Sequence, residues 1–178
     1  MTPTAEKEFL ERSRYYLSDE YLPKIKQCVA ALPDEEIWRR ANQSSNSIGN
    51  LLLHLAGNVR QWIVGGVGEE DVERDRAGEF AARGGASGAD LIANLERAVA
   101  EADSVLAKLS ADDLGRRCLI QDRDKTVLEA IYHVVEHFAM HTGQIVLLTK
   151  AYAPGKIRFY DDSTPAAHPV WGGKEGIR

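Results

Sequence analysis

The sequence IYHVVEHFAMH, residues 131–141, decides the fold, because it joins a helical apolar pattern to three evenly spaced histidines. His133, His137 and His141 are four residues apart, and four residues on an α-helix advance by about 400°, so neighbouring rings point in nearly the same direction. Two imidazoles at positions i and i+4 can bind one divalent cation at about 2.0–2.1 Å. The stretch therefore predicts a largely buried helix with a metal site. The spacing does not choose between the pairs His133/His137 and His137/His141.

Length and composition limit the class of protein. The chain has 178 residues and a net charge of −5, which fits one domain, or one domain with a tail. Lysine and arginine are scattered among acidic residues, so no basic stripe is present and we expect no nucleic-acid partner. No apolar run is long enough to span a bilayer, and the N-terminus lacks a signal pattern. We therefore expect a cytoplasmic protein with no membrane partner.

Apolar residues recur at helical spacing in four long segments. These segments are residues 4–31, 47–64, 88–109 and 126–151. Pro23 predicts a kink or break near residues 20–22 of the first segment. Four amphipathic segments joined by loops predict a helical bundle, a fold that builds metal sites from side chains on facing helices.

The remaining segments are expected to be short or irregular. Residues 68–88 are charged and rich in glycine, and we interpret them as a surface loop with one helical turn. Residues 117–120 are interpreted as a short extended piece. The domain organisation we expect is a bundle over residues 1–154, followed by a tail over residues 155–178 that is either a flexible arm or a strap packed on the bundle or a neighbour.

His54 is the obvious third metal ligand. A catalytic divalent site usually has three protein ligands and one open position. His54 is the only ionisable group in the apolar centre of its segment, and a buried neutral imidazole needs a partner. Asn50 and Asn58 lie four residues to either side of it, where they would contact the substrate or the ligands. A core histidine bound to an Asn or a carbonyl is the alternative, but the histidines of the other segment favour a ligand.

Gln144 lies near the end of the histidine run, three residues after His141. Its amide has both donor and acceptor groups and is placed to orient a histidine ring or a substrate. An ordinary hydrogen bond between helices is the alternative. Glu136 is rotated by about 100° from its neighbour His137, so we expect it to face solvent or another helix.

Two stretches of the chain resemble the DinB superfamily of DinB/YfiT-like metalloenzymes. They are SIGNLLLHLAGN, residues 47–58, and HVVEHFAMHTGQI, residues 133–145. The resemblance spans roughly residues 5–152 and implies an all-α fold, an up-and-down four-helix bundle of the DinB/YfiT-like type, with an irregular C-terminal tail outside it. It also implies a homodimer and a bound divalent metal, for which zinc and nickel are the first candidates. Nitrogen ligands also suit iron or copper.

The resemblance also chooses among the histidines. The ligand from the second helix falls on His54, and the pair from the fourth helix falls on His137 and His141, since His141 directly precedes Thr-Gly-Gln. His133 is then a pocket residue behind the ligands, or a spare ligand one turn away.

The function expected from these observations is that of a metal-dependent enzyme with a small-molecule substrate. Some DinB-like relatives are transferases or isomerases that use a low-molecular-weight thiol such as mycothiol or bacillithiol. The resemblance therefore implies transfer or isomerisation through a metal-activated thiol, or hydrolysis by metal-activated water. The alternative is a non-catalytic, dimeric metal-binding or stress-response module, and a third interpretation has no metal at all.

Overall fold

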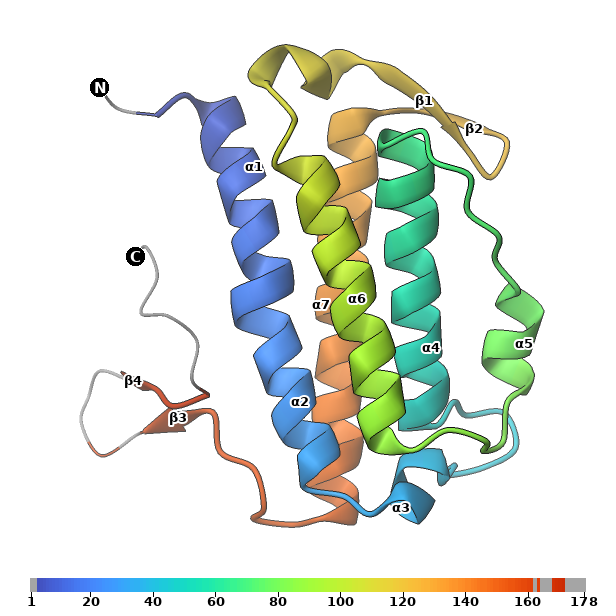
Figure 1. Cartoon of the computed structure of the whole chain (residues 1–178). Helices are drawn as coiled ribbons and strands as arrows, with labels where there is room; N and C mark the ends of the chain where they lie inside the picture. Colours follow the sequence, from blue (N-terminus) through green and yellow to red (C-terminus); the bar gives the residue numbers. More distant parts are fainter. Residues whose placement is uncertain (1–2, 162, 164–167, 172–178) are drawn as a thin grey trace.

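The computed structural model describes residues 3–161, 163 and 168–171, and in this part of the chain four long helical segments stand side by side (Figure 1). The first consists of α1 (Ala5–Tyr15), the π-helical η1 (Tyr16–Tyr21) and α2 (Leu22–Ala30); the second of α4 (Ile48–Val59) and the π-helical η2 (Arg60–Val67); the third is α6 (Gly88–Leu106), and the fourth is α7 (Val127–Tyr152). The all-α, four-helix fold expected from the sequence is confirmed.

Short elements connect the long ones or follow them. The helices are α3 (Asp34–Trp38), α5 (Arg76–Ala81) and the 3₁₀ turn η3 (Ala111–Gly115); the strands are β1 (Arg117–Ile120), β2 (Arg123–Thr126), β3 (Tyr160–Asp161) and β4 (His168–Pro169). The extended piece predicted at residues 117–120 is the first strand of an antiparallel hairpin, in which Ile120 faces Arg123 across a two-residue turn. In the tail, Tyr160 is paired with Pro169.

Side-chain caps define where three of the long helices begin. In each capping box the first residue accepts a bond from the backbone N–H of the third helical residue, whose side chain bonds back to the cap. The pairs are Ser47 with Asn50 for α4, Ser87 with Asp90 for α6, and Thr126 with Glu129 for α7. The helices bury their apolar faces in one core, and its largest fully buried side chains come from all four segments: Ile25, Leu52, Leu55, Leu95, Phe138 and Ile145.

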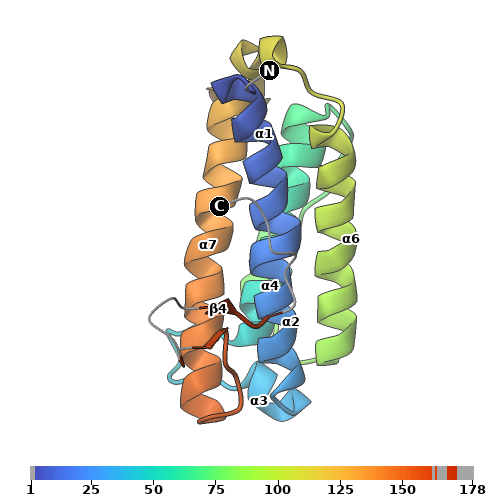
Figure 2. The ribbon, with the colours of Figure 1, turned by 90° about the vertical axis from the view of Figure 1, so that its left-hand side faces the viewer.

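The chain does not alternate direction strictly, which corrects the up-and-down order expected for the bundle. In Figure 1, α4 and α6 run the same way, and residues 68–87 return along the outside of α4 between them. The contacts indicate the same direction, because the C-terminal ends of the two segments lie together. A Cβ on Gly68, directly after the second segment, would meet Val105 near the end of α6. The long crossover is possible because residues 68–87 contain only the short α5, and bundles with such connections are known. α1 and α2 lie diagonally opposite α4, between α6 and α7 (Figure 2).

The first segment has a π-helical stretch next to Pro23 and no break, where the sequence predicted a kink or a break. The six residues of η1 directly precede α2, in which Pro23 is the second residue. Proline has no N–H for the carbonyl of Asp19 four residues earlier. The indole Nε1 of Trp171 donates to that carbonyl at 3.4 Å, and Lys24 Nζ lies 3.9 Å from the centre of the same ring. The described end of the tail therefore packs on the bundle.

Parts of the expected tail, residues 162, 164–167 and 172–178, lie outside the described residues.

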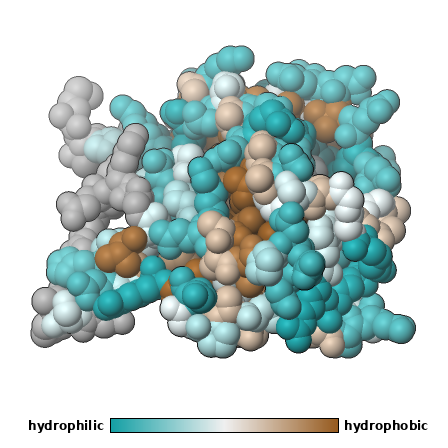
Figure 3. Space-filling model, turned by 60° about the horizontal axis from the view of Figure 1, so that its bottom comes forward, coloured by the Kyte–Doolittle hydropathy of each residue, from teal (hydrophilic) through white to brown (hydrophobic). Residues whose placement is uncertain are grey.

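The face seen in Figure 3 is mostly hydrophilic, with a hydrophobic strip near its centre. None of the described helices combines the length and the apolar content needed to cross a membrane.

Candidate metal centre

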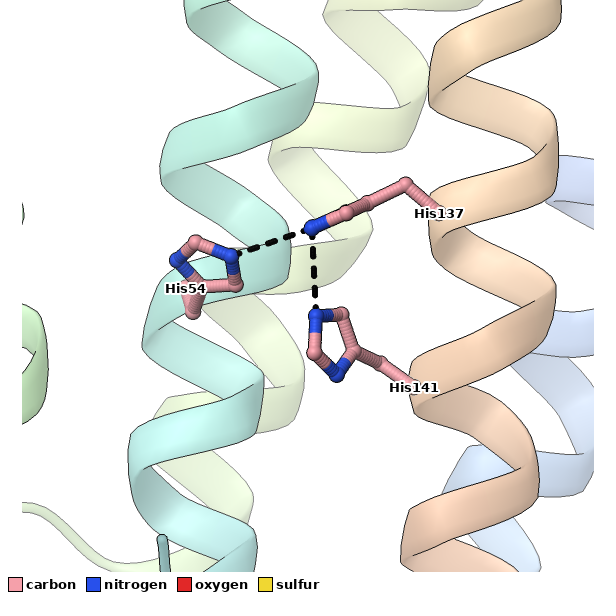
Figure 4. A group of neighbouring side chains, drawn as sticks. All are labelled: His54, His137 and His141. Atoms are coloured by element: carbon pink, nitrogen blue, oxygen red, sulfur yellow. Dashed lines mark hydrogen bonds between the residues drawn. The ribbon is translucent and has the colours of Figure 1, made fainter.

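Three histidine side chains from two helices meet at one point in the bundle. His54 projects from α4, and His137 and His141 project from α7, with all three rings turned toward one another (Figure 4). The Nε2 atom of His137 lies 3.1 Å from the Nε2 atom of His54 and 3.1 Å from that of His141. One ligand atom from each residue lies within 4.8 Å of the others. The group could hold a metal ion.

Hydrogen bonds at the far side of two rings show which nitrogens carry protons. His54 Nδ1 lies 2.9 Å from the Glu79 carboxylate, and His141 Nδ1 lies 2.7 Å from the Gln144 amide oxygen. Both oxygens can only accept. His54 Nδ1 also lies 3.1 Å from Arg74 Nη2, but the Nη2 hydrogens have the Glu79 carboxylate and the His54 carbonyl as acceptors. Both Nδ1 atoms are therefore assigned as donors, and both Nε2 atoms present lone pairs in the neutral rings. His137 Nε2 has at most one proton to share between them. At least one close nitrogen pair therefore lacks a hydrogen, and a cation at the centre would satisfy all three lone pairs.

Burial keeps the α7 histidines neutral. Desolvation, with the nearby charges of the other histidines and of Arg74, lowers the pKa of His137 to about 3. Desolvation also lowers the pKa of His141, although its bond to Gln144 acts in the opposite direction. A metal binds only the neutral imidazole, so little proton release is needed at these two positions near pH 7. Among the residues that the structure describes, the buried His137 Nδ1 atom has no hydrogen-bond partner. His137 is therefore the one ring of the three whose orientation no hydrogen bond at Nδ1 fixes.

Glu79 and Arg74 are functional residues that the sequence did not reveal. Both side chains are buried, and they form a bidentate ion pair. Arg74 Nε lies 2.6 Å from Glu79 Oε1, and Arg74 Nη2 lies 2.7 Å from Glu79 Oε2. Burial would raise the pKa of Glu79, but the bonds and charge of Arg74 and the bond from His54 together lower it. The carboxylate therefore stays ionised and fixes the His54 ring, as carboxylates behind metal-binding histidines do.

Gly57 provides the space for this carboxylate. A Cβ at Gly57 would lie 2.0 Å from Glu79 Oε1 and 2.8 Å from Arg74 Nε. Glu79 itself is carried by α5, whose first turn is capped by Asp75. The segment expected to be a surface loop with one turn does contain that turn, but its glutamate points into the bundle. A glycine one turn after His54 was the available signal, since it indicates a close approach to the helix.

A cavity of about 480 Å³ opens beside the histidines. His54 and His137 line it, together with Asn58, Trp62 and His133. The rings of Trp62 and His133 lie against each other with centroids 4.1 Å apart, and His133 is 5.3 Å from His137 by the same measure. Desolvation lowers the pKa of His133; Glu136 opposes this effect, while Arg123 and Lys125 add to it. His133 is thus placed in the pocket beside the three-histidine group.

The other residues singled out from the sequence have different surroundings. Gln144 contacts His141, as described above. Asn58 lines the cavity, and its buried Oδ1 atom has no hydrogen-bond partner within residues 3–161, 163 and 168–171. Asn50 lies away from the cavity: its Nδ2 atom donates to the carbonyls of Glu79 and Ala82, at 2.8 and 2.9 Å. Asn50 thereby holds the segment that carries Glu79. Glu136 is exposed, as expected, and stands at the cavity wall.

Comparisons with known proteins agree with this fold. The model of the family described as "Protein of unknown function (DUF1572)" matches residues 4–159, and the chain belongs to this family. A crystal structure of a DinB-like protein from Bacillus cereus ATCC 10987 has a TM-score of 0.65 at 18% identity, covering 87% of this chain and 99% of that one. A conserved protein from Enterococcus faecalis has a TM-score of 0.66 at 17% identity, covering 79% and 94%. No curated protein sequence matches. The fold that the DinB-like resemblance implies is therefore confirmed.

The lowered pKa of His137 predicts a pH dependence of stability for the metal-free protein. Its pKa is about 3 when folded against 6.5 ordinarily, so between these values the unfolded chain binds a proton that the folded protein does not. The free energy of unfolding should fall as the pH is lowered from 6.5 to 5, a window above the ordinary pKa of carboxylates. Urea denaturation across this window should show a shallower slope for His137→Gln. The exposed His168 supplies the control, and an equal slope in His137→Gln and His168→Gln would contradict the prediction.

Proposed function

We propose that the protein binds one divalent metal ion through the Nε2 atoms of His54, His137 and His141. The observation that carries this proposal is the meeting of three Nε2 atoms, two of which have their Nδ1 protons bound outward by Glu79 and Gln144. Three neutral nitrogen donors suit zinc or nickel, and also iron or copper. For His54 and His141, the pattern matches that of metal sites in which an outer partner fixes the histidine's tautomer.

We further propose that the site is catalytic. Three protein ligands leave a coordination position open, whereas structural zinc sites have four. The cavity lies on the side of His54 and His137, so a substrate would approach the open position from there. A divalent cation held there would lower the pKa of a bound thiol or water and so supply a nucleophile near neutral pH. This chemistry supports a transferase or isomerase that uses a small thiol, or a hydrolase; the alternative is a metal-binding module without turnover.

The chain's own residues would position the reactants. Glu79 and Gln144 orient two of the rings, and the packed pair of Trp62 and His133 forms an aromatic wall for the substrate. The surrounding hydrophobic core keeps the site away from bulk water on its other sides, because the α4 and α7 residues next to the ligands are fully buried: Leu55, Val134 and Phe138. A restricted entry through the cavity favours a small-molecule substrate.

Removing one ligand tests the metal proposal. Purified protein should contain about one equivalent of metal per chain, and His54→Ala or His141→Ala should lose most of it, because two remaining imidazoles hold a divalent ion weakly. Elemental analysis by mass spectrometry measures the content, and circular dichroism checks the fold. His168→Ala is the control, since His168 lies in β4 and is exposed. Metal retained in both ligand variants would contradict the assignment.

Gly57→Ala tests the role of the carboxylate without touching a ligand. The new methyl group would displace Glu79 from His54, and losing such an outer partner lowers metal affinity by about 10–100-fold. A competition titration with a chromophoric chelator measures the change. Gly65→Ala is the matched control, because a Cβ there would meet its nearest neighbours at an ordinary contact distance of 3.5 Å, and both changes replace a helical glycine. Equal affinities in the two variants would show that Glu79 is dispensable.

We also propose that the protein forms a homodimer through α7. One face of this helix exposes large apolar side chains: Leu128, Tyr132, Met140 and Leu147. Gly143 lies on the same face with open space above it, which allows a second helix to approach closely. The exposed Glu136 lies between Tyr132 and Met140 on this face, and the apolar side chains to either side of it support an interaction surface.

A charged side chain on this exposed face of α7 should dissociate the proposed dimer into monomers. Leu147→Glu places a carboxylate at a side chain that is 69% exposed, and Leu119→Glu, on the β1–β2 hairpin at 71%, is the matched control. Sedimentation at micromolar concentration should show a dimer for the native protein and the control, and a monomer for Leu147→Glu. A native monomer, or a dimer that Leu147→Glu leaves intact, would contradict this interface.

A further inference from the structure

We propose that the cavity beside the three histidines binds a ligand with an acidic group, a carboxylate or a phosphate, that pairs with Arg76 and Arg123. The inference rests on the proposed metal centre, since the other end of the same ligand would reach the metal. It adds the chemical class of the substrate, which the three histidines alone do not define.

The charges around the cavity carry the first part of the argument. Four cations line the cavity against two acids: Arg74, Arg76, Arg123 and Lys125 against Glu129 and Glu136. Two of these cations are already engaged, because Arg74 pairs with Glu79 and Lys125 pairs with Glu129. The excess is positive although the whole chain has a net charge of −5. A local field opposite in sign to that of the whole protein favours an anionic ligand.

Arg76 and Arg123 are the two cations left for a ligand. In the part of the chain that the structure describes, neither has a carboxylate within ion-pair distance. Arg76 lies with its guanidinium carbon 5.1 Å from the centre of the Phe80 ring, and this ring lies 4.6 Å from that of His54. Arg76 is therefore connected by ring contacts to the proposed metal ligand. Arginine is well suited to this role because its planar fork binds carboxylate and phosphate with two hydrogen bonds.

The β1–β2 hairpin places Arg123 at the cavity. Arg123 directly follows the turn residues Gln121 and Asp122, which adopt φ angles of 54° and 59° although neither is glycine. Such a turn costs energy for side chains other than glycine. The turn is tied to the site, since Gln121 Nε2 donates to Gln61 Oε1 at 2.6 Å and Arg74 Nη1 donates to the same oxygen at 2.7 Å. The network that fixes Glu79 thus also holds the hairpin, and with it Arg123.

Two unpartnered polar groups in the cavity wall also indicate a ligand. Asn58 Oδ1 and Trp62 Nε1 are buried with no hydrogen-bond partner in the described part of the chain, and both residues are 4% exposed. Both residues line the cavity. Buried polar groups are nearly always paired, so an unpaired donor and acceptor beside a cavity indicate a site that a ligand completes. The ligand would therefore combine an acidic group, a flat or apolar body against Trp62, and a donor for the metal.

Thiol probes with and without an acid test the inference. The metal-free protein is loaded with Co²⁺, and thiol binding is followed by the thiolate-to-cobalt charge-transfer absorption. The probes are 6-mercaptohexanoate, 6-mercaptohexyl phosphate and the neutral 6-mercaptohexanol, with three- to five-carbon homologues to match the span of the cavity. The acidic probes should bind about tenfold more tightly than the alcohol of the best length, as expected for charge-assisted bonds that are partly exposed to solvent. The tighter acid identifies the source as carboxylate or phosphate.

Arginine variants locate the effect. Arg76→Gln and Arg123→Gln should each remove a large part of the acid's advantage and leave the affinity for the alcohol unchanged. Arg97→Gln is the control, because Arg97 is exposed on α6 and does not line the cavity. Equal binding of acid and alcohol, or an advantage that survives in both variants, would overturn the anion site and leave the metal proposal standing. Cobalt d–d absorption without a charge-transfer band for any probe would overturn the inference alone, whereas no cobalt d–d absorption on loading would overturn the metal proposal.

Discussion

The ion pair between Glu79 and Arg74, with its bond to His54, is the interaction on which the rest of the site depends. It joins the crossover segment to α4, and it decides which nitrogen of His54 faces the centre. Both charges are buried, so each compensates the desolvation of the other, and removing either partner would cost about 3–5 kcal/mol. Such a pair is weak as a source of stability. It is useful because it sets the position and the tautomer of one ring.

The topology of the bundle follows from the same requirement. Because α4 and α6 run in the same direction, the chain between them must return along the bundle, and it passes along the outside of α4 on the way (Figure 1). There it contacts His54 through Glu79. The return segment brings Arg74, Arg76 and Glu79 to the site, and Asn50 anchors it through two backbone carbonyls. The hairpin before α7 closes the cavity from the other side. A long connection and a hairpin thus give a simple bundle an enclosed site.

The sequence was informative where the signal is local. Helix positions followed from apolar spacing and caps, and His54 stood out because an ionisable side chain in an apolar helix needs a partner. The structure places this ring next to those of His137 and His141, as expected, and it places His133 against Trp62. The choice of His137 and His141 as the pair came from the resemblance, because spacing alone treats the two pairs equally.

The sequence did not predict the contacts that depend on the path of the chain between the helices. Residues 68–88 show no periodicity, so nothing in them indicates that Glu79 turns inward while neighbouring acids stay exposed. Asn50 looked like a pocket residue because it shares a helical face with His54, but it bonds to the crossover segment instead. The direction of α6 relative to α4 also has no local signal, since a loop of about 20 residues permits either direction.

X-ray absorption at the edge of the bound metal tests the central claim most directly, because it reports the donor atoms without a crystal. The account predicts light-atom donors at about 2.0–2.1 Å, with the outer-shell scattering of three imidazoles and one further oxygen from solvent. A sulfur donor at about 2.3 Å, from Cys28 or Cys118, or scattering from fewer than two imidazoles, would contradict it.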